Sequence, residues 1–488
     1  MRKLFPIREN PAPMRRESHP WVTLIGAGLM LGQSVLAQTS GETVKLLFST
    51  EQDITNTWGR LHFGVTPLQL VTNCANPGFE LSYCQPRSDG EWEVYGQAFK
   101  KGPASKDQVK EANTWQIIRS TTRDGLHFAN AETVFSSEPG PWTFNHAMAY
   151  NPDAKEFMLL KLKMDNAGFR YTAFFSPDGR QWKQHPVCPL FYDGDAISLF
   201  WSTQLHRFIC VSKSLQPFPK HFRDHGGATS GLKDDTLRDR RVLAFRSSRD
   251  GRVWEPSDSM EDVWNRGGHK QPRSNNVLTL PDAEDPPDLE FYSGNGFWYY
   301  DRCYLMVLNY AASPLAARKH GPHLDTEWWV GHDGLRWERP DRGVNATGAE
   351  VTRLTHNPML IGGMLLLHYG NRVLGMKQDR ISFVGARANA EFSTRPFVMP
   401  PADLVLNAAI PSPDRPFTKQ QAYVMADVLD ECGQVVPGFE AEQCVIQKAD
   451  QIDLPLRWGG KSARIFAGRQ ISLRFHLRSA NIYAVTSK

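Results

Sequence analysis

The sequence predicts an all-β protein, a five-bladed β-propeller followed by a small C-terminal β-sandwich. Three observations lead to this prediction. The phrase Ser-x-Asp-Gly-x-x-Trp recurs along the chain, and an apolar, β-rich run precedes each copy. The composition is rich in turn-forming and aromatic residues, with 38 Gly, 33 Pro and 14 Trp among 488 residues. A strand–turn–strand unit that repeats along a chain is typical of propellers.

The repeated phrase is complete at 176–182 and 248–254, returns without its Ser at 331–337, and has a looser copy at 122–128. In such a phrase the Asp accepts hydrogen bonds from nearby backbone N–H groups, and the Gly supplies a positive φ for the turn of a β-hairpin. We therefore expect a structural role for the four aspartates of these turns, Asp124, Asp178, Asp250 and Asp333.

Around these turns, a unit of four strands can be written five times. Its first strand, called the A strand here, is predicted at 79–84, 146–150, 197–201, 289–292 and 354–360. In the fifth unit Asp379-Arg380 takes the turn position, and a strand at 381–384 follows it. Five such units in series predict five blades. A pair of β-sandwiches with chance Asp-Gly hairpins stays open as an alternative.

The first residues resemble an export signal. Arg15 and Arg16 precede an apolar run over 21–36, and Ala37 ends a small-residue cleavage site. Residues 1–37 are therefore predicted to be a signal peptide, with Met14 as an alternative start. An uncleaved membrane anchor is the alternative. We expect the mature chain to be secreted or periplasmic, with no stable membrane insertion after cleavage.

Charge and cysteine content indicate which binding partners and which covalent cross-links to expect. The formal net charge is +4 and no long basic block occurs, so no nucleic-acid partner is expected. Outside the cytoplasm, Cys74 with Cys84 and Cys432 with Cys444 are candidate disulfides. No His/Cys cluster has zinc spacing, so no cofactor and no metal ligand is predicted, while a structural calcium ion in the channel stays open.

Composition also places the domain boundary. Residues 45–70 are predicted to be an irregular opening, and the propeller is assigned to 45–400. Two insertions, 214–240 and 259–288, interrupt the blade pattern, and long loops of this kind usually lie on a face near a binding site. Pro400-Pro401 marks a boundary, and the short strands after it predict a β-sandwich over 401–488.

Several phrases late in the chain, together with this architecture, carry a family resemblance. They are Asp379–Val384, Glu391–Pro396, Leu404–Asn407, Gly438-Phe439 and Leu473–Phe475. The chain resembles the five-bladed β-propeller glycoside hydrolases, the invertase/levanase-like and arabinanase/xylosidase-like enzymes, and within them secreted bacterial proteins labelled invertase-like. The resemblance implies a secreted glycosidase that acts on an oligo- or polysaccharide.

The family's catalytic phrases do not carry over to this sequence. The nucleophile phrase Trp-Met-Asn-Asp-Pro-Asn-Gly and the phrase Arg-Asp-Pro are absent, and the Glu-Cys pair, Glu431-Cys432, falls in the predicted sandwich. The resemblance therefore implies the fold more directly than it implies the site residues.

Candidate catalytic residues are sought at the starts of the A strands, where side chains from several blades face the mouth of the channel. Glycoside hydrolysis needs two carboxylates, one as acid and one as base or nucleophile. Asp195 and Glu290 are the leading pair, and the reserves are Glu80, Asp193 and Glu327, the last of which is on the third strand of the fourth unit. Glu290 lies between Leu289 and Phe291, so strand alternation points it away from both.

Further polar and aromatic residues near these points are predicted to bind substrate: His146, Asp193, Asp288, Asp325, Trp142 and Arg119. Simpler explanations remain beside them. Asp193 and Asp195 flank a Gly, which an ordinary turn would explain, and His146 could be a structural histidine. A non-catalytic carbohydrate-binding propeller and a scaffold propeller with a plugged channel are the alternative functions.

Overall fold

The computed structural model describes residues 43–74, 77–100, 114–137, 146–165, 168–217, 239–256, 276–282, 284–285, 289–311, 323–347, 354–411 and 421–488. These residues belong to one compact unit, Ala37–Lys488. The predicted signal peptide lies outside them. Within them the structure is nearly all β, and the helices are short 3-10 turns, none of which is long and apolar enough to span a membrane.

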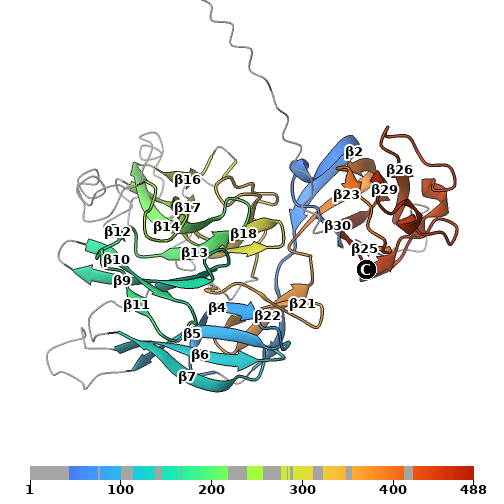
Figure 1. Ribbon diagram of the computed structural model, residues 1–488. Coiled ribbons are helices and arrows are strands. Elements are labelled where there is room, and N and C mark those ends of the chain that lie inside the picture. Colours follow the sequence, from blue (N-terminus) through green and yellow to red (C-terminus); the bar gives the residue numbers. More distant parts are fainter. Residues whose placement is uncertain are drawn as a thin grey trace, which may run out of the picture. The chain divides into compact units, whose positions relative to one another are not determined.

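Five antiparallel sheets form the predicted five blades (Figure 1). Blade 1 contains β4 (Glu80–Pro86), β5 (Trp92–Lys100), β6 (Thr114–Thr122) and β7 (Ala129–Ser136). Blade 2 contains β8 (His146–Asn151), β9 (Glu156–Asp165), β10 (Gly168–Ser176) and β11 (Lys183–Gln184), with β12 (Phe191–Tyr192) also paired to β10. Blade 3 contains β13 (Ile197–Ser202), β14 (Arg207–Pro217), β15 (Asp239–Ser248) and β16 (Val277–Thr279).

Blade 4 contains β17 (Leu289–Tyr299), β18 (Arg302–Ala311) and β19 (His323–Gly331). Blade 5 contains β20 (Met359–Ile361), β21 (Met364–Tyr369), β22 (Arg372–Lys377) and β3 (Gln69–Asn73). Four of the A strands predicted from the sequence coincide with β4, β8, β13 and β17, but the fifth, predicted at 354–360, overlaps β20 only at 359–360, and 354–358 are not in a strand. Sequence periodicity therefore located the strands that line the channel.

The last strand of blade 5 differs from the prediction. The sequence analysis gave this position to 381–384, but β3, which precedes blade 1 in the chain, pairs with β22 in the register Arg372↔Asn73. Residues 382–394 instead form β23, which pairs with β2 in the C-terminal sheet. The prediction for 381–384 was wrong because a strand far away in sequence fills the edge of blade 5. The ring of blades is thereby closed by hydrogen bonds from both ends of the propeller.

The Asp-Gly turns have the predicted geometry. In blade 2, Asp178 Oδ1 accepts hydrogen bonds from the backbone N–H groups of Arg180 and Gln181, each at 2.9 Å. Gly179 has a φ of +68°, a region that favours glycine. The same acceptor pattern recurs at the other three aspartates. Their structural role is confirmed.

The glycines of these turns also seal the blades against one another. A Cβ built on Gly179 of blade 2 would overlap the phenol of Tyr95 in blade 1, and one on Gly251 of blade 3 would lie 2.7 Å from Met158 Sδ in blade 2. Gly334 of blade 4 meets Phe200 in blade 3, and Gly125 of blade 1 meets Ile361 in blade 5. Each turn thus contacts the preceding blade around the ring.

The remaining strands form one ten-stranded sheet, of which β2, β23, β25, β26, β29 and β30 are labelled in Figure 1. It contains β1 (Lys45–Leu47), β2 (Ile54–Val65), β23 (Ser382–Thr394), β24 (Phe397–Val398), β25 (Leu404–Ile410), β26 (Tyr423–Leu429), β27 (Val445–Ile446), β28 (Ala449–Pro455), β29 (Gln470–Arg478) and β30 (Ala480–Ser487). Its core contains the fully buried Phe392, Phe475 and Trp458. The C-terminal β layer was predicted, but 45–65 is ordered as β1, the 3-10 turn η1 (Glu51–Asp53) and β2 rather than irregular.

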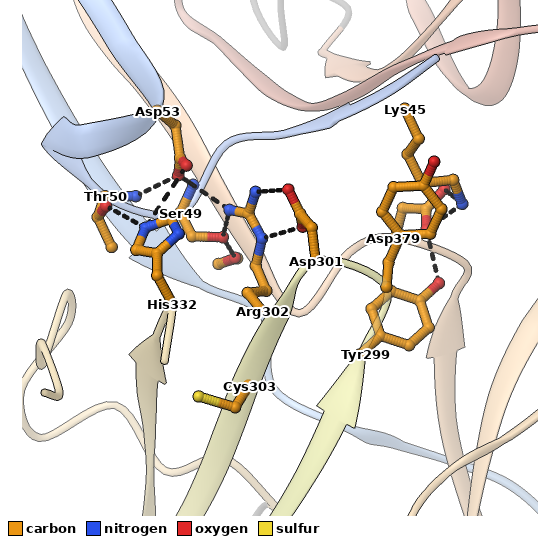
Figure 2. A network of polar contacts seen from close by, with 12 residues as sticks. Lys45, Ser49, Thr50, Asp53, Tyr299, Asp301, Arg302, Cys303, His332 and Asp379 are labelled. Atoms are coloured by element: carbon orange, nitrogen blue, oxygen red, sulfur yellow. Dashed lines mark hydrogen bonds and ion pairs between the residues drawn. The ribbon is translucent and has the colours of Figure 1, made fainter. Parts of the chain in front are cut away.

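A buried polar network joins residues near η1 to blade 4 (Figure 2). Arg302, 2% exposed, donates from Nη1 to Asp53 Oδ2 at 2.9 Å and to Ser49 Oγ at 2.8 Å. Its Nε donates to Asp301 Oδ1 at 2.9 Å. Asp53 also accepts from the backbone N–H of Thr50, at 2.9 Å, so one carboxylate both caps η1 and neutralises the arginine. A buried guanidinium is tolerated when its donors are matched in this way.

The predicted disulfides are absent, since all seven cysteines are free. Cys74 follows β3, which is in blade 5, and lies 3.9 Å from His368 Nδ1. Cys84 lies on β4 of blade 1, and its thiol donates to the Asn357 carbonyl at 2.8 Å. Cys74 and Cys84 therefore belong to different blades, although they are close in sequence. Cys432 is exposed at a hairpin turn while Cys444 is buried, so those two thiols occupy different environments.

Replacing Gly179 with Ala tests the contacts between blades. We expect a loss of about 2–4 kcal/mol in the free energy of unfolding, because strain from the positive φ adds to overpacking against Tyr95. Gly90→Ala is the matched control, since Gly90 has a φ of +80° and no atom within 4 Å of the added Cβ. It should cost only about 1–2 kcal/mol. Equal losses in denaturant titrations of the two variants would contradict the proposed role of Gly179.

Removing the Arg302 guanidinium tests the buried network. Arg302→Met should lower the free energy of unfolding by about 3–5 kcal/mol, because it leaves the carboxylate of Asp53 buried without its cation. Arg252→Met removes a more exposed pair with Glu156 and should cost at most about 1 kcal/mol. Urea unfolding of both variants makes the comparison. If Arg302→Met loses no more free energy of unfolding than Arg252→Met, the buried network contributes little to stability.

Candidate functional site

A cavity of about 230 Å³ occupies the channel between the blades. Strands of blades 1 to 4 and the segment that enters blade 5 all line it. Its polar lining includes Ser82, His146, Ser198, Asn295 and Thr355. Among the described residues, the lining contains no carboxylate. Its ionisable side chains are the imidazole of His146 and two tyrosines. The cavity offers hydroxyl, amide and imidazole groups to a ligand.

At one wall of the cavity, His146 at the start of β8 contacts Ser82 on β4. The His146 Nε2 and Ser82 Oγ atoms lie 2.7 Å apart. The imidazole packs on the Trp115 indole with ring centroids 4.8 Å apart, and Trp115 Nε1 donates to Gln97 Oε1 at 3.2 Å. His146 was predicted to bind substrate, and the structure places it on the cavity wall.

Contacts of the two preceding residues, Asp193 and Gly194, fix the backbone that carries Asp195 in the loop before β13. Asp193 and Arg246, each 1% exposed, form an ion pair of 3.0 Å. The Tyr171 hydroxyl donates to the Gly194 carbonyl at 2.5 Å. A Cβ on Gly194 would overlap the Lys213 carbonyl, so only glycine fits this approach. Asp193 is therefore a buried anchor of this loop, while the Asp195 side chain is 31% exposed and forms an ion pair with Lys213.

Two cations and a tyrosine bring the leading pair of carboxylates into one cluster. Lys213 Nζ lies 5.0 Å from the centroid of the Tyr292 ring, and Arg241 Cζ lies 5.4 Å from it. Lys213 pairs with Asp195, and Arg241 Nη1 donates to Glu290 Oε2 at 2.7 Å. This group of five residues, called the Tyr292 cluster here, lies where β13 and β17 begin. Ile197 and Ser293, a few residues further along these strands, line the cavity.

The reserve carboxylate Glu327 lies in a different buried network of blade 4. Arg339 donates to Glu327 Oε1 at 2.6 Å and to Asp285 at 2.6 and 2.7 Å. Asn309 Nδ2 also donates to Glu327, at 3.0 Å. Asp325, predicted to bind substrate, is half-buried on β19 opposite Asn309. Glu327 is therefore hydrogen-bonded to other partners than the carboxylates of the Tyr292 cluster.

The other predicted residues lie apart. Glu80 is exposed at the start of β4 and accepts from Gln97 Nε2 at 2.5 Å. Arg119 is buried inside blade 1, where it donates to Glu93 at 2.6 Å and to Glu132 at 2.8 Å. Trp142, Asp288 and most of both insertions lie outside the described residues. No group of three or more His, Cys, Asp or Glu within the described ranges is arranged to hold a metal ion.

Two buried histidines mark the contact between blades 5 and 1. His356 Nδ1 donates to the Asn357 carbonyl at 2.7 Å, so His356 Nε2 accepts from the His368 backbone N–H at 2.8 Å. Burial lowers the pKa of His356 to about 3 and the pKa of His368 to about 4. Both imidazoles are therefore neutral near pH 7, which suits the hydrogen bonds that His356 makes.

Sequence reasoning did not identify several members of this site. Arg241 lies beside an insertion, and Ser82 is one of many serines, so neither stands out in the sequence. Their roles come from contacts between different blades: Arg241 of β15 reaches Glu290 of β17, and Ser82 of β4 reaches His146 of β8. Gly194 was the available signal, because a glycine between two aspartates can mark a close backbone approach.

Comparisons with known proteins find similarities among solved structures. No protein-family model and no curated protein sequence matches the chain. Among solved structures, it is similar to a glycosyl hydrolase from Bacteroides ovatus, with 13% identity over 64% of this chain and 86% of that chain and a TM-score of 0.38. It is also similar to a GH32 β-fructofuranosidase from Bombyx mori, with 8% identity over 84% and 93% and a TM-score of 0.35. At these values the likenesses carry no conclusion about substrate or reaction.

Acidification tests the two neutral histidines. A histidine whose pKa is lower when folded than the ordinary 6.5 contributes stability that is complete above pH 6.5 and is lost as the pH falls towards about 3. Each such site adds a slope of up to about 1.4 kcal/mol per pH unit within that window. Urea unfolding at pH 4, 5, 6 and 7 should therefore show a steeper loss in the wild type than in His356→Gln.

His206→Gln is the control for this experiment, because the His206 side chain is 65% exposed. Its pH profile should match that of the wild type. If the free energy of unfolding of His356→Gln falls with pH as steeply as that of the wild type, His356 does not contribute to the loss of stability in acid.

Proposed function

We propose that the protein is a glycoside hydrolase-like protein that cleaves an oligo- or polysaccharide at the mouth of the propeller channel, with Asp195 and Glu290 as its carboxylates. The observation that carries the proposal is the Tyr292 cluster, in which Lys213 and Arg241 bring both carboxylates to the same tyrosine. The cavity that begins beside the cluster has the hydroxyl and amide lining that a sugar requires.

The surroundings of the two carboxylates suggest different roles. Glu290 is 1% exposed, and its Oε2 also accepts from the Arg241 backbone N–H at 3.3 Å. Hydrogen bonds from a cation favour the ionised carboxylate, which suits a base or a nucleophile. Asp195 is paired with a cation too, Lys213, but its side chain is 31% exposed, so a substrate can reach it more easily than Glu290, and on that ground it is assigned the role of the acid. Substrate has to displace the Arg241 side chain before it can contact Glu290.

A second candidate is a carbohydrate-binding propeller without turnover. Its supporting observation is that Asp193, Asp195, Glu290 and Glu327 each form an ion pair with Lys or Arg. Carboxylates engaged in this way can position hydroxyl groups of a sugar without transferring a proton. Secretion or periplasmic location, proposed from the N-terminal sequence, suits either candidate.

A glycan-hydrolysis screen of the wild type and of Asp195→Asn tests the proposal. We expect the wild type to release reducing sugar from at least one glycan and the variant to be slower by about 10²–10⁴-fold, the usual contribution of a general acid. Glu290→Gln should lose activity to a similar extent. Reducing-end assays on a glycan panel provide the measurement.

Asp403→Asn is the matched control, because Asp403 is 34% exposed and pairs with Arg457 in the C-terminal sheet. It should keep the wild-type rate. Full activity in Asp195→Asn would overturn the assignment of the acid. Glycan binding by calorimetry, with no turnover of any bound glycan, would favour the second candidate.

A further inference from the structure

Ser82 and His146 form a pair that hydrolysis by two carboxylates does not use. Their 2.7 Å contact is within the range in which a histidine can take a proton from a serine hydroxyl. The other acceptor near Ser82 Oγ is the Glu80 carbonyl at 3.4 Å, at the limit of hydrogen bonding. The shorter contact therefore favours donation of the Ser82 proton to His146 Nε2.

The backbone around Ser82 presents this side chain to the cavity. The register of β4 against β5 shifts between Leu81 and Tyr83, so Ser82 occupies a β-bulge. Bulges of this kind turn a side chain out of the regular alternation of a strand, and they are frequent beside active sites. Ser82 and His146 both line the 230 Å³ cavity, so a ligand in the cavity can reach them.

The imidazole is held in place from behind. Trp115, fully buried, packs on the His146 ring, and its indole N–H is bound to Gln97. Gln97 in turn donates to Glu80, so the support extends across three strands of blade 1, β6, β5 and β4. A base fixed by packing and by hydrogen bonds keeps its position relative to the nucleophile, as an active site requires.

We propose that Ser82 is a nucleophile activated by His146 and that it cleaves a small acyl ester of a hydroxyl-rich alcohol bound in the cavity. Ser82 Oγ bonds to the ester carbonyl carbon while its proton passes to His146 Nε2. The carbon–oxygen bond to the alcohol then breaks, and the leaving oxygen takes that proton. Water then bonds to the acyl carbon while one of its protons passes to His146 Nε2; the bond between that carbon and Ser82 Oγ breaks, the carboxylic acid leaves, and Ser82 Oγ takes the proton back. This activity is independent of glycosidic cleavage by Asp195 and Glu290.

A fluorophosphonate probe, which reacts with activated serines, tests the proposal directly. We expect one label per wild-type chain, located on the peptide that contains Ser82 by mass spectrometry. Ser82→Ala should abolish labelling and hydrolysis of p-nitrophenyl acetate. His146→Gln should slow labelling by at least about 10²-fold, the usual contribution of a general base.

Ser120→Ala is the control, because Ser120 is a buried serine of the same blade whose hydroxyl donates to the Ala129 carbonyl at 2.6 Å. It should be labelled at Ser82 at the wild-type rate. No labelling of the wild type, or labelling at another serine, would overturn the proposal, and so would ester hydrolysis by Ser82→Ala at the wild-type rate. Mapping the label on the wild type decides the question even if a variant fails to fold.

Discussion

Closure of the ring of blades is the constraint on which the rest of the structure depends. The strand β3 completes blade 5 from the beginning of the propeller, and the glycines of the Asp-Gly turns let each blade approach the preceding one. The cavity depends on this closure, because strands of blades 1 to 4 and the segment that enters blade 5 line it together. The Tyr292 cluster and the Ser82–His146 contact each join two neighbouring blades.

Paired charge is the second theme of the channel region. Asp193, Glu290 and Glu327 are almost fully buried, and each contacts an arginine that packs on an aromatic ring. Burial of a carboxylate is costly unless a cation and further donors compensate for the lost water. The arginines therefore fix the carboxylates in place, but they also compete with any substrate for the same oxygen atoms. Reactivity in this region depends on which pairs a ligand can open.

The parts of the fold that depend on local sequence were predicted well. The Asp-Gly turns and the A strands depend on neighbouring residues, so they located all five blades. The contacts that define the candidate site could not be predicted, since Ser82 and His146 are 64 positions apart and belong to different sheets. The same reason explains β3 and Cys74, which lie just before blade 1 in sequence but belong to blade 5 in space. Sequence proximity was a poor guide wherever a ring brings its two ends together.

The closing strand has a consequence for how the chain reaches its fold. Gln69–Asn73 leaves the ribosome before any blade exists, and its partner Arg372–Lys377 follows only after nearly the whole propeller has been made. Until then Gln69–Asn73 lacks its partner strand, and an unpaired strand edge tends to associate with other chains. The interval between synthesis of the first and last strands is thus a period of vulnerability to aggregation. A chaperone that shields Gln69–Asn73 during that interval would raise the yield of closed rings.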